Sequence, residues 1–461
     1  MQVMRTFIND LFRNNNFYMK LWDKGFSVDE KIDRFTVGKD RELDLYLAPY
    51  DVLGTMAHIT MLESVGLLEK DELDALLPEL KAIYGQACDG SFVIEDDIED
   101  VHSQVELMLT RKLGDLGKKV HTGRSRNDQV MVDLKLFARA EIEKTVSKVK
   151  ALFDVLQKRS EECKDILMPG YTHLQVAMPS SFGMWFGAYA ESLAEDMEML
   201  LAAWKVTNRN PLGAAAGYGS SAPLDRSLTT ALLGFDDLDY NSVYAQMGRG
   251  KTERIISFAF ASVAETLGRL AMDCCLFNSQ NFAFVKLPDA LTTGSSIMPH
   301  KKNPDVFELI RAHCNRINGI PGTIRLIGTN LPSGYFRDMQ LIKEVFVPMF
   351  EEMDDCLDIA KFAIENMTVA KDLMSDSRYQ LAFSVEEVNR RVAEGVPFRD
   401  AYRQVGMEIQ KGEFTWKGEL HHTHEGSVGN LCNGQIAAKM DHVLELFTFK
   451  SVSAALSALL S

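Results

Sequence analysis

Residues 128–165 contain neither proline nor glycine, and this run constrains the fold more than any other feature of the sequence. Its apolar residues recur mostly at steps of three and four, with lysine and glutamate between them, as in an amphipathic helix. Pro169 and Gly170 mark its end. A helix of this length exceeds the usual range in compact domains. The sequence therefore favours a bundle of long helices over an α/β fold.

Four more segments repeat this pattern, so we expect a five-helix central bundle in an all-α protein. They are 180–206, 251–279, 304–328 and 339–366. Segment 251–279 is apolar on nearly all sides, which predicts burial against other subunits. The flanks show shorter helical patterns and more turns. We expect three helical domains, at 1–118, 119–366 and 367–461, with a loose extension at 1–19.

Composition and charge exclude several classes of protein. The chain of 461 residues carries a net charge of −15, which argues against nucleic-acid binding through a broad basic surface. An anionic substrate would therefore need a local positive pocket. No uninterrupted apolar run approaches the roughly 18 residues of a membrane span, so no membrane partner is expected. Seven scattered cysteines without a CxxC motif fit a reducing cytoplasm better than a disulfide framework or a zinc site.

Three polar segments interrupt the helical pattern, each at a predicted helix end. The first, at 121–129, reads His-Thr-Gly-Arg-Ser-Arg-Asn-Asp-Gln and precedes the longest helix. Arg126 and Asn127 at a helix N-terminus could clamp a carboxylate through charge-assisted hydrogen bonds and the helix dipole. The alternative is a simple helix cap formed by Ser125 or Asp128.

The second polar segment, 171–175, lies between two predicted helices. Thr172 and His173, if directed into one site, could bind a carboxylate and move protons. A single loop histidine is more often ordinary, and this alternative stays open.

The third polar segment reads Gly-Ser-Ser-Ile-Met-Pro-His-Lys-Lys-Asn-Pro-Asp at 294–305. A hydroxyl followed by cations and amide donors suits removal of a proton beside a carboxylate. The hydroxyl can take the proton, and the cations and helix-end N–H groups can hold the charge that develops. Glu308 follows one turn past Pro304; alternatively, it forms an i,i+3 surface pair with Arg311.

Together the three segments resemble the signature regions of the fumarase/aspartase superfamily, in the same order and at the same helix boundaries. Within it, the 121–129 string, the His-Leu-Gln element and the Ser-Ile-Met-Pro-x-Lys-Lys-Asn-Pro-Asp string are similar to those of argininosuccinate lyases and their delta-crystallin relatives. The likeness runs from Lys20 to about residue 407. It implies a homotetramer with a twenty-helix core and four sites, each shared between three subunits.

The resemblance also implies the chemistry: anti elimination of argininosuccinate to arginine and fumarate, with no cofactor and no metal. Ser295 would remove the Cβ proton. His173, oriented by Glu308, would protonate the leaving guanidinium or assist Ser295. Lys301 and Asn303 would hold the dianionic intermediate. A serine has no basicity of its own near neutral pH, so the resemblance leaves open how Ser295 is activated.

The same resemblance implies two sets of substrate-binding residues, one for each end of the substrate. They are Arg126, Asn127 and Thr172 for the succinyl end, and Tyr335, Gln340 and Lys343 for the arginine end. His102, Asp51 and Thr55 match further site residues of the family. The last two stand in an Asp-Val-Leu-Gly-Thr string where the family usually has Asp-x-x-Gly-Ser.

Several strings depart from the family pattern, among them residues 213–219 and Gly248-Arg249-Gly250. His300 replaces a usual glutamine, as in adenylosuccinate lyases, and residues 22–26 replace the usual Trp-Gly-Gly-Arg-Phe. The alternatives are therefore adenylosuccinate lyase or another succinyl-substrate lyase and, in another class, a structural protein like the inactive crystallins.

Two further motifs carry less weight. Residues 217–222 match the dinucleotide-binding fingerprint loosely but follow no predicted strand, so a nicotinamide-dependent oxidoreductase is the weakest alternative. A cluster of three histidines, His421, His422 and His424, could suggest a metal site, but no HExxH motif or cysteine partner accompanies it. We expect a solvated or capping cluster there.

Overall fold

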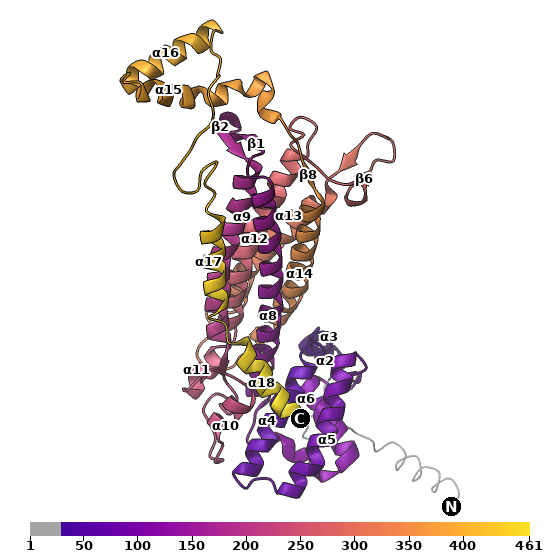
Figure 1. Cartoon of the computed structure of the whole chain (residues 1–461). Coiled ribbons are helices and arrows are strands. Elements are labelled where there is room, and N and C mark those ends of the chain that lie inside the picture. Colours follow the sequence, from indigo (N-terminus) through magenta and orange to yellow (C-terminus); the bar gives the residue numbers. More distant parts are fainter. Residues whose placement is uncertain (1–28) are drawn as a thin grey trace, which may run out of the picture.

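The computed structural model describes residues 29–461, and five long helices form its central bundle (Figure 1). These helices are α8 (Arg126–Glu162), α9 (Phe182–Thr207), α12 (Lys251–Phe277), α13 (Asp305–Ile327) and α14 (Lys343–Asn366). The predicted all-α fold class and the five-helix bundle are thus confirmed. The fifth helix begins later than expected because the 3-10 helix η3 (Arg337–Ile342) precedes it.

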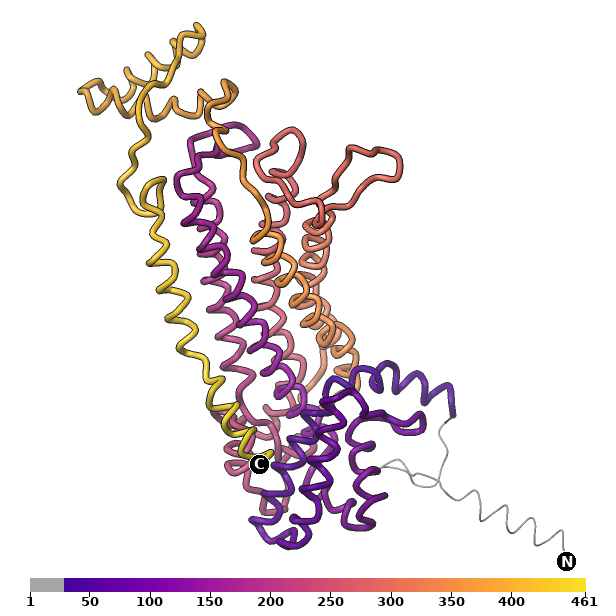
Figure 2. Tube along the Cα trace, turned by 45° about the vertical axis from the view of Figure 1, so that its right-hand side comes forward, coloured from indigo at the N-terminus to yellow at the C-terminus, as the bar shows by residue number. Residues whose placement is uncertain are grey.

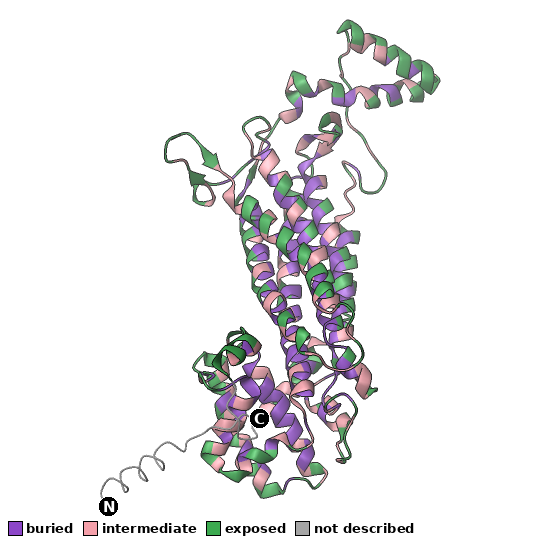
Figure 3. Ribbon diagram, turned by 180° about the vertical axis from the view of Figure 1, so that it is seen from behind, coloured by how far each residue is buried: buried purple, intermediate pink, exposed green. Residues whose placement is uncertain are grey.

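Aromatic rings hold the centre of this bundle together. Phe350 on α14 makes edge-to-face contacts with Phe260 on α12 at 4.9 Å and with Phe137 on α8 at 5.3 Å between ring centroids. Such pairs stabilise a core beyond the area that they bury. Figure 3 shows buried residues along the inner faces of the long helices and exposed residues on their outer faces.

A group of shorter helices from the N-terminal part of the chain packs beside one end of the bundle, at the lower right of Figure 1. They are α2 (Glu30–Val37), α3 (Asp40–Asp44), α4 (Ala48–Ser64), α5 (Lys70–Asp89), α6 (Val101–Leu113), α7 (Asp115–Lys118) and the 3-10 helix η1 (Lys119–His121). Helix α4 packs against α8 as well as against α5. The N-terminal helices are therefore fixed against the start of the longest helix.

Between α9 and α12 the chain forms short elements at this same lower end. These are β3 (Arg209–Asn210), α10 (Arg226–Leu232), β4 (Asp237–Leu238) and α11 (Ser242–Met247). The glycine-rich string at 217–222 lies in the irregular stretch before α10 and begins no helix. It therefore lacks the strand–turn–helix context of a dinucleotide-binding motif.

The opposite end of the bundle carries hairpins and the C-terminal helices. The elements there are β1 (Leu167–Thr172), β2 (Gln175–Ser181), β5 (Val285–Lys286), η2 (Asp289–Leu291), β6 (Thr293–Gly294), β7 (Lys302–Asn303), β8 (Thr368–Val369), η4 (Leu373–Ser375), η5 (Ser377–Phe383), α15 (Ser384–Ala393) and α16 (Phe398–Lys411). Strand β1 pairs with β2, β5 with β8, and β6 with β7, all antiparallel. Two of the three polar segments therefore form hairpins, which the sequence reading took for simple loops.

The last part of the chain returns along the whole bundle (Figure 2). Helix α17 (Asn433–Leu444) lies against α9, and α18 (Phe449–Leu460) contacts α10 and α4. At the junction, Trp204 stacks edge-on against Phe449 at 4.6 Å and donates a hydrogen bond to Thr448 Oγ1 at 3.1 Å. This returning segment ties the C-terminus to the N-terminal helices.

The histidine cluster anchors this returning segment. His422 Nδ1 lies 2.6 Å from Ser427 Oγ, and its Nε2 lies 3.1 Å from Glu386 Oε1 on α15. His421 and His424 join no group of metal-ligand spacing within residues 29–461. The imidazole of His422 thus holds the segment to α15.

Two helical stretches meet a length and hydropathy criterion for a membrane span, although the sequence has no uninterrupted apolar run of that length. They are α12 and the stretch Asn433–Leu460. The most apolar window of α12 is 56% buried inside the bundle, so packing against neighbouring helices accounts for the high hydropathy of α12. The second stretch, 11% buried in its apolar window, is divided between α17 and α18. The expected extension at 1–19 and the altered string at 22–26 lie outside the described residues.

Candidate active site

A cavity of about 150 Å³ lies where the N-terminal helices meet the lower end of the bundle. Elements α3, α6, α8, η3 and α14 all contribute to its walls. Among the predicted site residues, those that line it are His102, Arg126, Asn127, Tyr335, Gln340 and Lys343. Three segments that lie far apart in the sequence therefore meet in one place.

The start of α8 combines a helix cap with a cationic surface. Ser125 Oγ accepts a hydrogen bond from the Asn127 N–H at 3.3 Å, and Asp128 accepts one from the Ser125 N–H at 2.8 Å. This is a capping box. The capping alternative is thus confirmed, and it does not exclude the clamp, because Arg126 and Asn127 line the cavity from the first turn.

Asp128 has a second contact that shapes this end of the bundle. Its Oδ2 accepts hydrogen bonds from the N–H groups of Gly213 at 3.1 Å and Ala215 at 2.9 Å. Burial raises the pKa of Asp128 to about 6, against the lowering effect of these hydrogen bonds. The carboxyl group thereby fixes the loop after β3 to the start of α8.

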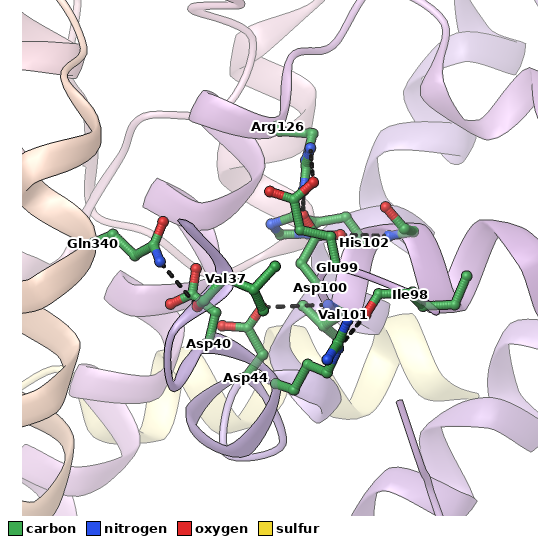
Figure 4. A network of polar contacts seen from close by, with 12 residues as sticks. Val37, Asp40, Asp44, Ile98, Glu99, Asp100, Val101, His102, Arg126 and Gln340 are labelled. Carbon is green, nitrogen blue, oxygen red and sulfur yellow. Dashed lines mark hydrogen bonds and ion pairs between the residues drawn. The ribbon is translucent and has the colours of Figure 1, made fainter. Parts of the chain in front are cut away.

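Carboxylates of the same chain already face the cations of the cavity, and Figure 4 shows this for Arg126. Arg126 forms ion pairs with Glu99, at 3.4 Å, and with Asp100. Arg337 Nη2 lies 2.6 Å from the other oxygen of Glu99. A substrate carboxylate that entered here would compete with these side chains for the guanidinium groups.

The predicted arginine-end residues also have partners within the chain. Gln340 Nε2 donates to the carbonyl oxygens of Thr36 and Val37 at 2.8 and 3.0 Å. Lys343 Nζ lies 2.7 Å from Asp40 Oδ1 and 2.6 Å from Asp44 Oδ1. Their contacts fix α2 and α3 against η3 and α14. Their role in binding substrate stays a prediction.

Burial and charge act in opposite directions on the Lys343 cluster. Burial favours the neutral amine, but the Asp44 and Asp40 carboxylates outweigh it and raise the pKa of Lys343. Burial raises the pKa of Asp40, although Lys343 opposes the shift. The ammonium group therefore stays charged at this wall of the cavity.

Asp51 and Thr55 lie behind the cavity rather than in its wall. Both are nearly inaccessible, with 2% and 1% of their surface exposed. Asp51 Oδ1 lies 2.6 Å from His102 Nδ1, and Thr55 Oγ1 accepts a hydrogen bond from Arg124 at 3.0 Å. In this chain both side chains contact neighbours of the cavity rather than the cavity itself, and their role in binding substrate stays a prediction.

The remaining predicted residues lie at the opposite end of the bundle. Thr172 ends β1, and His173 and Leu174 form the two-residue turn to β2, with φ angles of 54° and 58°. Left-handed backbone is strained for residues other than glycine, but a tight hairpin turn requires it. The turn presents His173 as an exposed imidazole.

The Ser295 loop forms the tip of the β6–β7 hairpin at the same end. Ser295 Oγ accepts hydrogen bonds from the N–H groups of Met298 at 3.1 Å and Ile297 at 3.4 Å. Lys301 is exposed, and Asn303 Nδ2 donates to a neighbouring threonine at 3.5 Å. The loop thus offers a hydroxyl and an ammonium group to the surface.

Glu308 is exposed on the first turn of α13. Within the described part of the chain it forms no ion pair with Arg311, whose Nη1 lies 2.9 Å from Met272 Sδ. Nor does it contact His173 in the same chain. The proposed orienting contact would have to form between chains.

A single chain therefore carries two separated halves of the predicted site. Helix α8 has 37 residues, and at 1.5 Å per residue it spans roughly 55 Å. One end carries the cations that line the cavity. The other end, where the β1–β2 and β6–β7 hairpins lie (Figure 1), carries the hydroxyl, imidazole and ammonium groups. Neither half alone contains all of the predicted site residues.

Several residues that line the cavity were not predicted as site residues from the sequence. They are Asp40, Asp44, Glu99, Asp100, Arg249 and Arg337. Arg249 is 4% exposed, and its Nη2 donates to the Met339 carbonyl at 3.1 Å. Its Gly-Arg-Gly context was visible as a departure from the family strings, whereas Asp40 and Asp44 gave no local signal.

Comparison with known proteins identifies the class. A family model described as lyase matches residues 24–319, well over half of the chain, and the chain belongs to this lyase family. Within it, an argininosuccinate lyase of Parabacteroides distasonis is 64% identical over 436 residues, 95% of this chain and 98% of that protein. An argininosuccinate lyase of Bacteroides thetaiotaomicron is 62% identical, and the match covers 96% of this chain and 99% of that protein. The chain is thus a member of the argininosuccinate lyase family.

More distant relatives agree on the family and on the fold. An argininosuccinate lyase of Thermotoga neapolitana is 36% identical over 84% of this chain and 97% of its own. The crystal structure of an EDDS lyase with formate matches with a TM-score of 0.72 at 22% identity, over 94% and 95% of the two chains. A class II fumarase from Schistosoma mansoni matches with a TM-score of 0.66 at 17% identity, over 83% of this chain and 91% of that chain. The structures support the helical-bundle fold alone.

Proposed function

We propose that this protein cleaves argininosuccinate to L-arginine and fumarate in arginine biosynthesis. The observation that carries the proposal is the cavity in which Arg126, Asn127 and His102 converge at the N-terminus of a long helix. Cationic and amide donors at a helix N-terminus suit a dicarboxylate. The identity of 62–64% with argininosuccinate lyases over nearly the full chain supports the same substrate.

In this proposal Ser295 removes the Cβ proton, the Cα–N bond then breaks, and the double bond of fumarate forms. The two N–H groups directed at Ser295 Oγ favour its deprotonated form, because hydrogen bonds to the charged state stabilise it. Lys301 and Asn303 hold the intermediate, whose carboxylate carries a second negative charge. His173, with Glu308 as its partner, returns a proton to the leaving guanidinium.

We further propose that the active enzyme is a homotetramer in which copies lie antiparallel. The lower half-site of one chain would then meet the upper half-sites of others. Exposed apolar side chains on the long helices support this: Phe258 is 53% exposed, Leu326 75% and Phe362 52%. A groove of about 650 Å³ lined by α9, α12 and α13 runs beside Phe258. Large apolar surfaces of this kind are typical of subunit interfaces.

A second cavity, lined by four cationic side chains and here called the positive hollow, lies beside the first. It bears on how a chain with a net negative charge could attract an anionic substrate. Arg249, Lys251, Arg254 and Arg325 line this cavity of about 210 Å³, which shares Arg249 and Tyr335 with the first. Arg249 pairs with Glu253 at 2.8 Å, but the other three cations form no ion pair with residues 29–461. We propose that they attract the anionic substrate toward the cavity against the field of the whole chain.

The direct test is fumarate release, followed by ultraviolet absorbance, with argininosuccinate and adenylosuccinate supplied in parallel. Turnover of argininosuccinate alone is expected. Turnover of adenylosuccinate would restore the alternative suggested by His300, and no turnover of either would point to a structural protein. We place the reaction in the cytoplasm; what supports this is that all seven cysteines are free thiols.

A further inference from the structure

His102 stands between the cavity and two buried carboxylates. Its Nδ1 lies 2.6 Å from Asp51 Oδ1 on α4 and 3.5 Å from Asp133 Oδ2 on α8. The three residues are 6%, 2% and 1% exposed, and only His102 lines the cavity. Since Nδ1 is engaged from behind, Nε2 is the polar ring atom left for the cavity, and no described residue bonds to it.

The two carboxylates have few other partners. Asp51 Oδ2 and both oxygens of Asp133 are buried and accept no hydrogen bond from the described residues. An uncompensated buried charge is unfavourable, so the imidazole is the group that must offset it. Arg124 faces the cluster too, but its guanidinium is directed to Thr55 and to the Val120 carbonyl.

The electrostatics agree with this geometry. Burial alone would favour neutral imidazole, but Asp51, then Asp133 and Asp44, outweigh it and raise the pKa of His102 to about 8. Burial and the nearby Asp51 raise the pKa of Asp133 well above its usual value, against the lowering effect of His102, so Asp51 supplies most of the negative charge that faces the imidazole. His121 lies nearby as a neutral group, because burial and Arg124 lower its pKa to about 4.

We propose that Asp51 and Asp133 are positioning residues that hold His102 as an imidazolium, with its Nε2–H directed into the cavity toward a substrate carboxylate. This rests on the proposed function for the identity of the substrate. Asp51 then serves binding without touching the substrate. Asp133, which the sequence did not single out, is a second carboxylate that positions the same imidazolium.

A divalent cation is the competing interpretation, because one ligand atom from each of these three residues lies within 4.8 Å of the others. The separation of Asp51 and His102, 2.6 Å, is that of a hydrogen bond. It engages the very imidazole nitrogen that a metal would need. The geometry therefore favours a shared proton.

The test measures binding of succinate, a dicarboxylate that cannot react, by calorimetry between pH 6 and 9.5. In the unaltered enzyme, affinity should fall as pH rises through about 8, because His102 loses its charge. In Asp51→Asn the same fall should occur about one pH unit lower, so that binding near pH 7.5 is roughly threefold weaker. Asp133→Asn should move the profile in the same direction by less.

Matched controls separate this role from general destabilisation. Asp273→Asn removes a carboxylate that accepts hydrogen bonds from Trp185 and Tyr189 at 3.0 and 2.6 Å, away from the cavity, and should leave the pH profile unmoved. With argininosuccinate, Asp51→Asn should raise KM more than it lowers kcat.

Three results would overturn the inference. The first is succinate affinity that does not change with pH in the unaltered enzyme. This measurement does not depend on whether any variant folds. The second is an equal loss of affinity at every pH in Asp51→Asn, and the third is a stoichiometric divalent ion in the purified protein that Asp133→Asn removes. Because succinate binding needs no turnover, failure of the proposed function would appear separately, as absent cleavage with the binding profile intact.

Discussion

Lys343 and Asp44 form a buried ion pair, 2.6 Å between Nζ and Oδ1, that joins α14 to α3. The other oxygen of Asp44 accepts a hydrogen bond from the Val101 N–H at 3.3 Å, so the same carboxylate also holds the start of α6 (Figure 4). Three elements of the cavity wall are therefore connected through one side chain.

Replacement of Lys343 by methionine should destabilise the fold strongly. Methionine keeps the length of the side chain but leaves the Asp40 and Asp44 carboxylates without their counter-charge. Loss of one partner of a buried ion pair costs about 3–5 kcal/mol. Denaturant unfolding measures this, and Lys148→Met, which removes a more exposed lysine that pairs with Asp354 and Asp358, is the control. Equal midpoints for both variants would contradict the prediction.

His102 should make stability depend on pH. Against the effect of burial, the Asp51 carboxylate raises the pKa of His102 in the folded protein to about 8, above its usual value of 6.5. The charged form therefore contributes stability that is fully present below pH 6.5 and is lost as pH rises through 8, by about 2 kcal/mol in total. The slope of unfolding free energy against pH over this window should be smaller in His102→Gln. An unchanged slope would show that another group titrates there.

The sequence predicted the helices well and the cavity only in part, for a physical reason. Periodic burial along α8 is a local pattern, so each residue carries its own signal. Asp133 sits within that pattern as an ordinary helical polar residue, and only the folded chain brings it within 3.5 Å of His102. The His173–Leu174 turn lacks the glycine or asparagine that usually marks a two-residue hairpin, and so the hairpin was not foreseen.

Ser295→Ala should abolish turnover while leaving substrate binding nearly unchanged. The hydroxyl accepts two backbone N–H bonds at the tip of the β6–β7 hairpin, and its loss removes the proposed base but no cation. Ser296→Ala, which alters the adjacent hydroxyl, is the control. Single-turnover fumarate release and calorimetric binding separate the two effects. Near-normal turnover in Ser295→Ala would assign the base elsewhere.

Neutralising the positive hollow should slow capture of substrate without altering the chemical step. Glutamine at Lys251, Arg254 and Arg325 removes three cations that have no ion-pair partner among residues 29–461. We expect kcat/KM to fall by about tenfold at low salt and to depend less on ionic strength, with kcat unchanged. The same three changes at Lys70, Lys112 and Lys158, all exposed, are the control. A loss of kcat alone would contradict the steering role.

Mixed assemblies of the proposed tetramer test whether the two half-sites belong to different chains. Arg126→Ala removes the clamp at one end of α8, and His173→Asn alters the turn at the other end of the bundle. Each variant alone should be inactive, because every site would contain a defect. In mixtures that are partly unfolded and reassembled, some sites receive both intact halves, and a fraction of the original activity should return. His173→Asn mixed with Ser295→Ala gives the same information for the two upper hairpins, since recovery there requires that they come from different chains. Well-mixed tetramers without any recovery would show that each chain builds its site alone, which the span of α8 makes difficult.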